Sequence, residues 1–184
     1  MRIYESPAPA KVFEGPLDWS PDGSVLSFMA ITAPYESDIF LLNVKSGLIA
    51  NVTADSWYDE APAFTPDGKS LTFMSTRGGD WTWGLFQLSL ANGMVTPIAN
   101  PDHIEKNFPR IAADGSVLWT QLDPCMGLPL LAVRSRGSAA EFQSENPGAA
   151  WPSFSVDGKQ VLFTVLLHDV QYWLHPGLQA QLRD

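Results

Sequence analysis

The chain has little of several residue types on which common protein classes depend. Its 184 residues include one cysteine, Cys125, so an internal disulfide and a disulfide-stapled scaffold are excluded. Only 3 histidines occur, and they are too scattered to form a histidine-rich metal centre. Lysine and arginine number 11 against 20 aspartates and glutamates, so the formal net charge is −9. This acidic balance argues against nucleic acid as a partner, because phosphate backbones are repelled.

Long apolar runs and catalytic signatures are also missing. The N-terminal segment MRIYESPAPAKVFEG lacks a basic start followed by an apolar run, so no signal peptide is expected. No apolar run approaches the length of a membrane-spanning helix, so we expect no membrane insertion. The sequence contains no G-x-S-x-G elbow, no P-loop and no dinucleotide fingerprint. We therefore expect no cofactor and no metal, and no catalytic residue is assigned in this chain.

What the chain has is apolar, aromatic and turn-forming residues. It is 45% hydrophobic and 17% charged, which is typical of a globular protein. The 14 glycines and 15 prolines suit a protein with many turns. Seven tryptophans and ten phenylalanines favour strands over helices. These features together predict an all-β fold.

An Asp-Gly turn recurs four times along the chain, at intervals of 45, 47 and 43 residues. Such a nearly constant period indicates a repeat architecture. The aligned stretches are LDWSPDGSVLSF (17–28), PAFTPDGKSLTF (62–73), PRIAADGSVLW (109–119) and PSFSVDGKQVLF (152–163). The residues expected to shape the turns are Asp22, Gly23, Asp67, Gly68, Asp114, Gly115, Asp157 and Gly158.

Each repeat is predicted to be a four-stranded antiparallel meander of roughly 45 residues, the size of one propeller blade. Alternating apolar residues flank each Asp-Gly turn, which is typical of a hairpin. Two further strands follow, joined at Ser46-Gly47 in the first repeat and at Asn92-Gly93 in the second. In the fourth repeat, DVQYWLHPG and LQAQL take these places. The predicted blades cover approximately 16–60, 61–107, 108–150 and 151–184, within one domain spanning 1–184.

The turn motif, followed in the second repeat by STRGGDWTWGLFQLSLANG, resembles the PD40 (WD40-like) repeats of TolB-type β-propellers. Similar repeats form the propellers of prolyl-oligopeptidase-like peptidases and of oligogalacturonate lyases. The resemblance covers residues 16 to about 165, although Ala112-Ala113 and Val156 depart from the Ser-Pro pattern. It implies a β-propeller of four-stranded antiparallel blades, about four in number. It also implies a periplasmic or other extracytoplasmic location.

Four blades are few for this kind of propeller, and three explanations stay open. The chain is a fragment of a longer gene product, or it closes as a four-bladed ring. In the third explanation it self-associates with a second copy to complete a propeller. An open arc of blades would expose strand edges and an apolar face, which favours association.

The longer loops gather at one end of a meander, and rigidly held loops are where binding residues concentrate. We expect an aromatic and acidic surface there, whose rings stack on a sugar or peptide and whose carboxylates accept its hydrogen bonds. The alternative is that these rings pack against a neighbouring blade. Arg77 is expected to hold an anionic group or, alternatively, to pair locally with Asp80. The predicted binding residues are Trp57, Tyr58, Asp59, Glu60, Arg77, Asp80, Trp81 and Trp83.

Two functions are compatible with this sequence. The first is a non-catalytic TolB-like module that binds a protein or peptide. The alternative is the propeller part of a prolyl-oligopeptidase-like serine peptidase, which would gate substrate access to a hydrolase domain. A carbohydrate-active propeller is disfavoured. The resemblance to oligogalacturonate lyases implies a histidine-rich metal site, and the 3 histidines of this chain are scattered.

Overall fold

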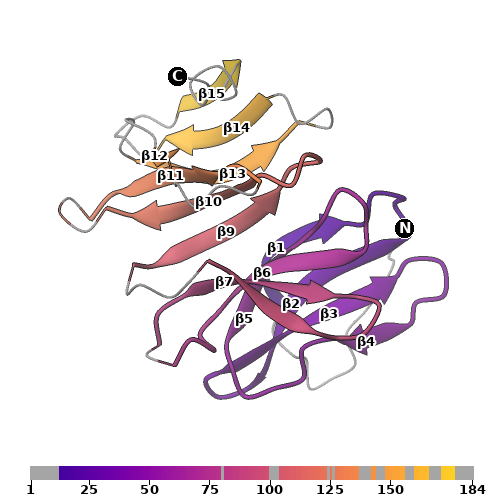
Figure 1. The fold of residues 1–184 in the computed structure, drawn as a ribbon. Helices are drawn as coiled ribbons and strands as arrows, with labels where there is room; N and C mark the ends of the chain where they lie inside the picture. The colour runs from indigo at the N-terminus through magenta and orange to yellow at the C-terminus, as the bar shows by residue number, and fades with distance from the viewer. Residues whose placement is uncertain are drawn as a thin grey trace. The chain divides into compact units, whose positions relative to one another are not determined.

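The computed structural model describes residues 13–79, 81–99, 104–123, 125, 127–136, 142–143, 148–155, 160–165 and 171–176. These residues form four antiparallel sheets that follow one another along the chain, as Figure 1 shows. The prediction of an all-β fold with four blade-like sheets is confirmed. Among the described residues, no helix has the length and apolarity needed to cross a membrane.

The chain divides into two compact units, Met1–Pro101 and Asp102–Asp184, and each unit holds two of the sheets. The first unit contains eight strands, paired in sequence order within each sheet. Its first sheet consists of β1 (Phe13–Trp19), β2 (Val25–Ala33), β3 (Glu36–Asn43) and β4 (Ile49–Asn51). Its second sheet consists of β5 (Asp59–Phe64), β6 (Ser70–Ser75), β7 (Gly84–Ser89) and β8 (Val95–Ala99).

The second unit repeats this plan. The third sheet consists of β9 (Lys106–Ile111), β10 (Val117–Leu122), β11 (Pro129–Arg134) and β12 (Phe142–Gln143). The described part of the fourth sheet consists of β13 (Ala149–Phe154), β14 (Gln160–Val165) and β15 (Gln171–Pro176). The strand expected over LQAQL, residues 178–182, lies outside the described residues.

A meander places its connections at two opposite ends of each sheet. In the first unit, the β1–β2, β3–β4, β5–β6 and β7–β8 connections are tight turns, and we call their side of the unit the turn end. The other side, which we call the loop end, carries the two-residue β2–β3 turn (Pro34-Tyr35) and two longer connections, the β6–β7 loop and the link from β4 to β5. The longer connections at the loop end are the natural place for binding residues.

Hydrogen bonds inside the Asp-Gly turns explain their sequence. The Ser20 hydroxyl donates to Asp22 Oδ1 at 2.6 Å, and the Thr65 hydroxyl donates to Asp67 Oδ1 at 2.7 Å. Gly23 has a φ of 69°, in the left-handed region that favours glycine. The Ser20 hydroxyl is the main cause that holds the pKa of Asp22 at about 2, below its usual 3.8. The Thr65 hydroxyl likewise lowers the pKa of Asp67.

The third turn keeps the geometry without the hydroxyl. Ala112 stands where the first two turns have serine or threonine, and its carbonyl still accepts the Gly115 N–H at 2.9 Å. Asp114 Oδ1 accepts the Ser116 N–H at 2.8 Å. The turn residues Asp157 and Gly158 of the fourth repeat lie outside the described residues.

The first strand of every sheet carries a β-bulge at an equivalent position. The residue that opens the bulge has a positive φ, and a proline follows it each time. A proline lacks the N–H of a strand ladder, so it fits where the pairing is already interrupted. The pairs, with the φ of the first residue, are Gly15-Pro16 (85°), Ala61-Pro62 (51°), Phe108-Pro109 (54°) and Trp151-Pro152 (49°).

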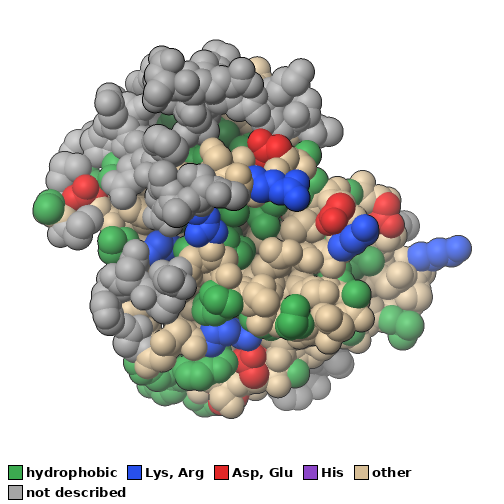
Figure 2. Space-filling model, viewed as in Figure 1, with side chains coloured by type: hydrophobic (Ala, Val, Ile, Leu, Met, Phe, Trp, Pro, Cys, Tyr) green, Lys and Arg blue, Asp and Glu red, His purple; other side chains and the backbone are tan. Residues whose placement is uncertain are grey.

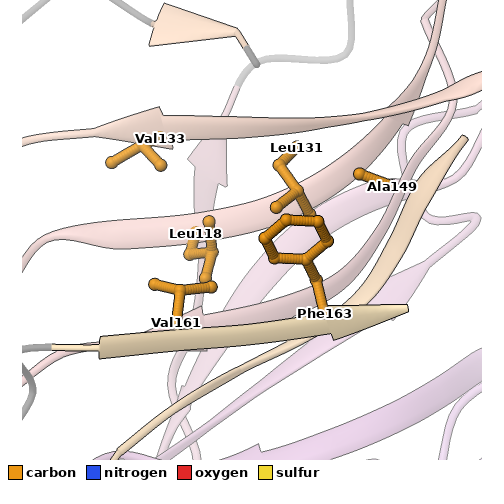
Figure 3. Close-up of a cluster of buried hydrophobic side chains, with 6 residues drawn as sticks. All are labelled: Leu118, Leu131, Val133, Ala149, Val161 and Phe163. Atoms are coloured by element: carbon orange, nitrogen blue, oxygen red, sulfur yellow. The ribbon is translucent and has the colours of Figure 1, made fainter. Parts of the chain in front are cut away.

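Each unit buries an apolar core that draws on both of its sheets. In the first unit this core consists of Met29, Ile39, Leu71, Phe73, Phe86 and Leu88. In the second unit it consists of Leu118, Leu131, Val133, Ala149, Val161 and Phe163, and Figure 3 shows these side chains pointing toward one another. Alternation along β6 and β14 sends every second side chain into these cores, as the period-2 pattern predicts.

Candidate binding surface

The loop end of the first unit brings four aromatic residues of the predicted binding set into one region. The rings of Tyr58 and Trp83 meet edge to face, with their centroids 6.1 Å apart. Trp57 precedes Tyr58 in the chain and is 39% exposed. Trp81, two residues before Trp83, is 66% exposed. One aromatic pair is therefore packed, while the two indoles beside it face solvent.

Backbone hydrogen bonds hold the link before β5 in place. The Ser37 N–H donates to the Trp57 carbonyl at 3.3 Å, and the Asp59 N–H donates to the Ser37 hydroxyl at 3.1 Å. On the other side, the Thr76 N–H donates to the Tyr58 carbonyl at 3.1 Å. The link is thus fixed between β3 of the first sheet and the end of β6 in the second. A fixed link presents Trp57 with little loss of conformational entropy on binding.

Arg77 organises the charged groups beneath this surface. One guanidinium nitrogen, Nη2, lies 2.6 Å from Asp59 Oδ2 and 2.9 Å from Asp55 Oδ2. Its Nε donates to the Ser75 hydroxyl at 2.9 Å. The guanidinium carbon also lies 5.1 Å from the ring centroid of Phe73, a cation–π distance. Arg77 therefore pairs with the β4–β5 link and the start of β5. The expected local partner, Asp80, lies outside the described residues.

Asp59 does not reach the surface on which the sequence placed it. Its side chain is fully buried, and this burial raises the pKa of the carboxyl although the Arg77 charge opposes the change. Oδ2 is paired with Arg77, whereas Oδ1 has no hydrogen-bond partner among the described residues. A buried carboxylate of this kind depends on its arginine, because an unpaired buried charge is strongly destabilising.

Asp38, which the sequence did not single out, completes the group. Its Oδ2 accepts a hydrogen bond from Asn51 Nδ2 at 2.8 Å, and its Oδ1 accepts one from the Thr53 hydroxyl at 3.2 Å. One carboxylate oxygen each from Asp38, Asp55 and Asp59 lies within 4.8 Å of the others, a spacing that could hold a metal ion. Arg77 already supplies positive charge to two of the three. We call Asp38, Asp55, Asp59 and Arg77 the Arg77 cluster.

The remaining predicted residue, Glu60, is half-buried in β5. Sequence reasoning missed Asp38 and Asp55 as partners of this site. Asp55 lies in the loop segment ADSWYDEA, so its position beside Trp57 was a usable signal. Asp38 had no such signal, because it stands in the middle of an alternating strand pattern.

The β-bulges in the first strand of each sheet were also missed, although a proline heads three of the four aligned stretches.

Two curated proteins show how this chain relates to known sequences. It is 35% identical over 107 residues to dipeptidyl-peptidase 5 of Porphyromonas gingivalis, across 51% of this chain and 16% of that protein. It is 24% identical over 172 residues to an uncharacterized protein of Agrobacterium fabrum, across 90% of this chain and 56% of that protein. The chain thus spans about a sixth of the length of the first relative and just over half of the second.

A solved structure and a family profile agree on the fold. The crystal structure of TolB from Acinetobacter baumannii superposes with a TM-score of 0.73 at 21% identity, covering 89% of this chain and 41% of that one. The sequence profile of the family described as the TolB beta propeller domain, PD40, matches residues 8–172. The resemblance carried by the Pro-Asp-Gly motifs is confirmed, and the chain belongs to the PD40 family of TolB beta propeller domains.

Proposed function

We propose that this chain is a non-catalytic binding module that presents the loop end of its first unit to a protein or peptide. The observation that carries the proposal is the pair of exposed indoles, Trp57 and Trp81, beside the packed contact of Tyr58 with Trp83. Tryptophan is among the residues that dominate binding energy in protein interfaces. A rigid repeat scaffold with aromatic loops fits this role, since the sheets hold the loops in place.

The exposed surface favours binding through a few large side chains over binding through one broad apolar patch. On the face drawn in Figure 2, hydrophobic side chains of the described residues lie in separate small patches with charged and polar groups between them. Binding energy at such a surface concentrates in large side chains that enter pockets of the partner. The two indoles are suited to this, because each has a large area to bury against a partner on binding and offers an N–H donor.

A peptide selection tests the proposal. A library of random peptides displayed on phage is selected against the purified chain, and the affinities of enriched peptides are measured by titration. The Trp57→Ala, Trp81→Ala double variant is expected to bind about tenfold more weakly, a loss of about 1.4 kcal/mol. The matched control is Leu48→Ala with Met94→Ala, which removes two exposed apolar side chains at the turn end.

Two outcomes would contradict the proposal. One is a selection that enriches no peptide with measurable affinity. The other is an equal loss of affinity in the indole variant and in the control variant.

A second candidate is the propeller part of a prolyl-oligopeptidase-like serine peptidase. It is favoured by the 35% identity to dipeptidyl-peptidase 5, of which this chain covers 16%. Reading the gene on both sides of these 184 residues tests it. A downstream G-x-S-x-G elbow supports the peptidase, whereas further PD40 repeats without an elbow exclude it.

We further propose, from the TolB likeness, that the module works in the periplasm. Fractionation of cells that express the complete gene product, followed by immunodetection, tests this location. Recovery of the protein with cytoplasmic markers would overturn it.

Self-association to complete a propeller also stays a proposal. Sedimentation equilibrium of the purified chain separates monomer from dimer. A monomer at all concentrations would argue against self-association.

A further inference from the structure

We propose that the partner segment carries a lysine or arginine that docks against the Asp55 carboxylate beside the Trp57 indole. This inference rests on the proposed function, because it names the chemistry of the ligand for the same surface. It goes further by assigning Asp55 a direct role in recognition.

The first argument is the distribution of charge over the first unit. Among its described residues, the two lysines, Lys45 and Lys69, both lie in tight turns at the turn end. At the loop end, the basic side chain among the described residues is Arg77, which is largely buried. The acidic residues described there are Glu36, Asp38, Asp55, Asp59 and Glu60. The loop end is therefore acidic, and charge complementarity favours a cationic partner.

The second argument is the balance within the Arg77 cluster. Three carboxylates lie close together and the Arg77 guanidinium pairs with two of them, so negative charge is in excess. Asp38 and Asp59 are buried, whereas the Asp55 side chain is 30% exposed. The excess negative charge therefore reaches solvent through Asp55, where a partner can approach it.

The third argument is the position of the indole. The backbone N–H of Trp57 donates to Asp55 Oδ1 at 3.0 Å, so the carboxylate and the exposed ring belong to one short turn. A guanidinium or ammonium group can meet a carboxylate and an aromatic face together, and each contact favours the cation. A neutral or acidic ligand would gain only the contact with the ring. We infer that Asp55 and Trp57 together select a cation on the partner.

The test compares two phage libraries of short random peptides that differ only in a fixed central residue, arginine in one and glutamate in the other. The arginine library is expected to give binders, and replacing its central arginine by glutamine is expected to weaken them about tenfold. This difference is expected to shrink in high salt, because Asp55 is partly exposed. Equal yields from the two libraries would overturn the inference and leave the proposed function standing. If neither library gives binders, both the inference and the proposed function fail.

Variants of the chain then assign the effect to Asp55. Asp55→Asn is expected to weaken the arginine peptide about tenfold and its glutamine version much less. The matched control is Asp22→Asn, which removes the same charge at the turn end and is expected to leave binding unchanged. Since Asp55→Asn also loosens Arg77, Trp57→Ala serves as a second variant that keeps all four charges of the Arg77 cluster. Equal weakening of both peptides by Asp55→Asn and by Trp57→Ala would overturn the inference, because it would show no preference for a cation.

Discussion

The two units join their sheets in different ways. In the first unit, the apolar core is capped at the loop end by the charged Arg77 cluster. In the second unit, Ala149 pairs with Val165 at the place where Asp59 pairs with Ser75. When Phe163 is aligned with Phe73, the position of Arg77 holds Leu167. In the fourth repeat, the sequence positions equivalent to Asp59 and Arg77 thus carry the apolar residues Ala149 and Leu167.

The third sheet extends this contrast. Lys106 pairs with Gln121 at the position equivalent to Asp59, so a buried lysine stands where the second sheet has a buried aspartate. Its Nζ lies 3.5 Å from the Ile104 carbonyl. The alternating apolar hairpin is therefore the shared part of the repeat, while the polar group at the loop end changes from sheet to sheet. This is where we expect function to differ between repeats.

The contrast also separates two kinds of stabilisation. An apolar interface gains from each buried group separately, so losses follow the size of the group removed. A buried charged group is stabilising only when all of its partners are present. The four predictions below use this difference, from the largest expected effect to the smallest.

Removing Arg77 is expected to have the largest effect. Arg77→Ala leaves the buried Asp59 without its cation and is expected to lower the free energy of unfolding by about 4 kcal/mol. Urea denaturation followed by tryptophan fluorescence measures this. Lys69→Ala, which removes an exposed cation, is the control and is expected to change stability by less than about 0.5 kcal/mol. A loss below about 1 kcal/mol for Arg77→Ala would show that the cluster is not a coupled unit.

Truncating the core of the second unit tests the apolar interface. Phe163→Ala is expected to destabilise by about 3 kcal/mol, because it removes a buried ring from the cluster in Figure 3. Phe163→Leu keeps most of the volume and is expected to cost clearly less. The same denaturation measurement compares them. Equal losses for the two variants would mean that the ring itself, and not the buried volume, matters at this site.

A single hydrogen bond between the first strands of the two sheets in the first unit is expected to have the next largest effect. Asp18 Oδ2 accepts the Phe64 N–H at 2.7 Å, joining β1 to β5. Asp18→Ala is expected to lower stability by about 2 kcal/mol, since it leaves a backbone donor without its charged acceptor. Asp18→Asn keeps an acceptor oxygen and should lose less. The equivalent residue of the third sheet is Arg110, so this bond has no counterpart of the same kind there. No difference between the alanine and asparagine variants would contradict the role of this bond.

The pH dependence of stability is expected to show the smallest effect. The folded-state pKa of Asp22 is about 2 against 3.8 for the free side chain, and that of Asp67 is also lowered. The stability from these turns is therefore present above pH 3.8 and is lost as the pH falls toward about 2. Asp59 has the opposite sign, because its raised pKa gives a contribution that is lost as the pH rises through its folded value.

Denaturation of the wild type and of an Asp22→Asn, Asp67→Asn variant across this acid range checks the sign. The variant is expected to lose less stability between pH 4 and pH 2 than the wild type. A steeper loss in the variant would contradict the assignment of the lowered pKa values to these two turns.

Local chemistry along the chain was enough to predict the four sheets. The three described Asp-Gly turns each carry a hydrogen-bonding partner of the aspartate within two residues, and the strands around them alternate with period 2. The bulges were not predicted, although a proline marks each of them, and their positive φ values came only from the structure. The exposure of Trp57 and Trp81 could be expected only in general terms, because aromatic loop residues also pack.

The sequence by itself therefore determined the strands, their turns and the repeat, since these depend on residues that are neighbours in the chain. Only the tertiary structure decided that Arg77 pairs with Asp55 and Asp59, that Asp38 joins them, and that Asp59 is buried. The partners of Arg77 lie 18 and 22 residues away on other elements, and no local pattern specifies contacts over such separations. Burial and pairing of charges depend on how two sheets pack, and packing sums contributions from the whole unit.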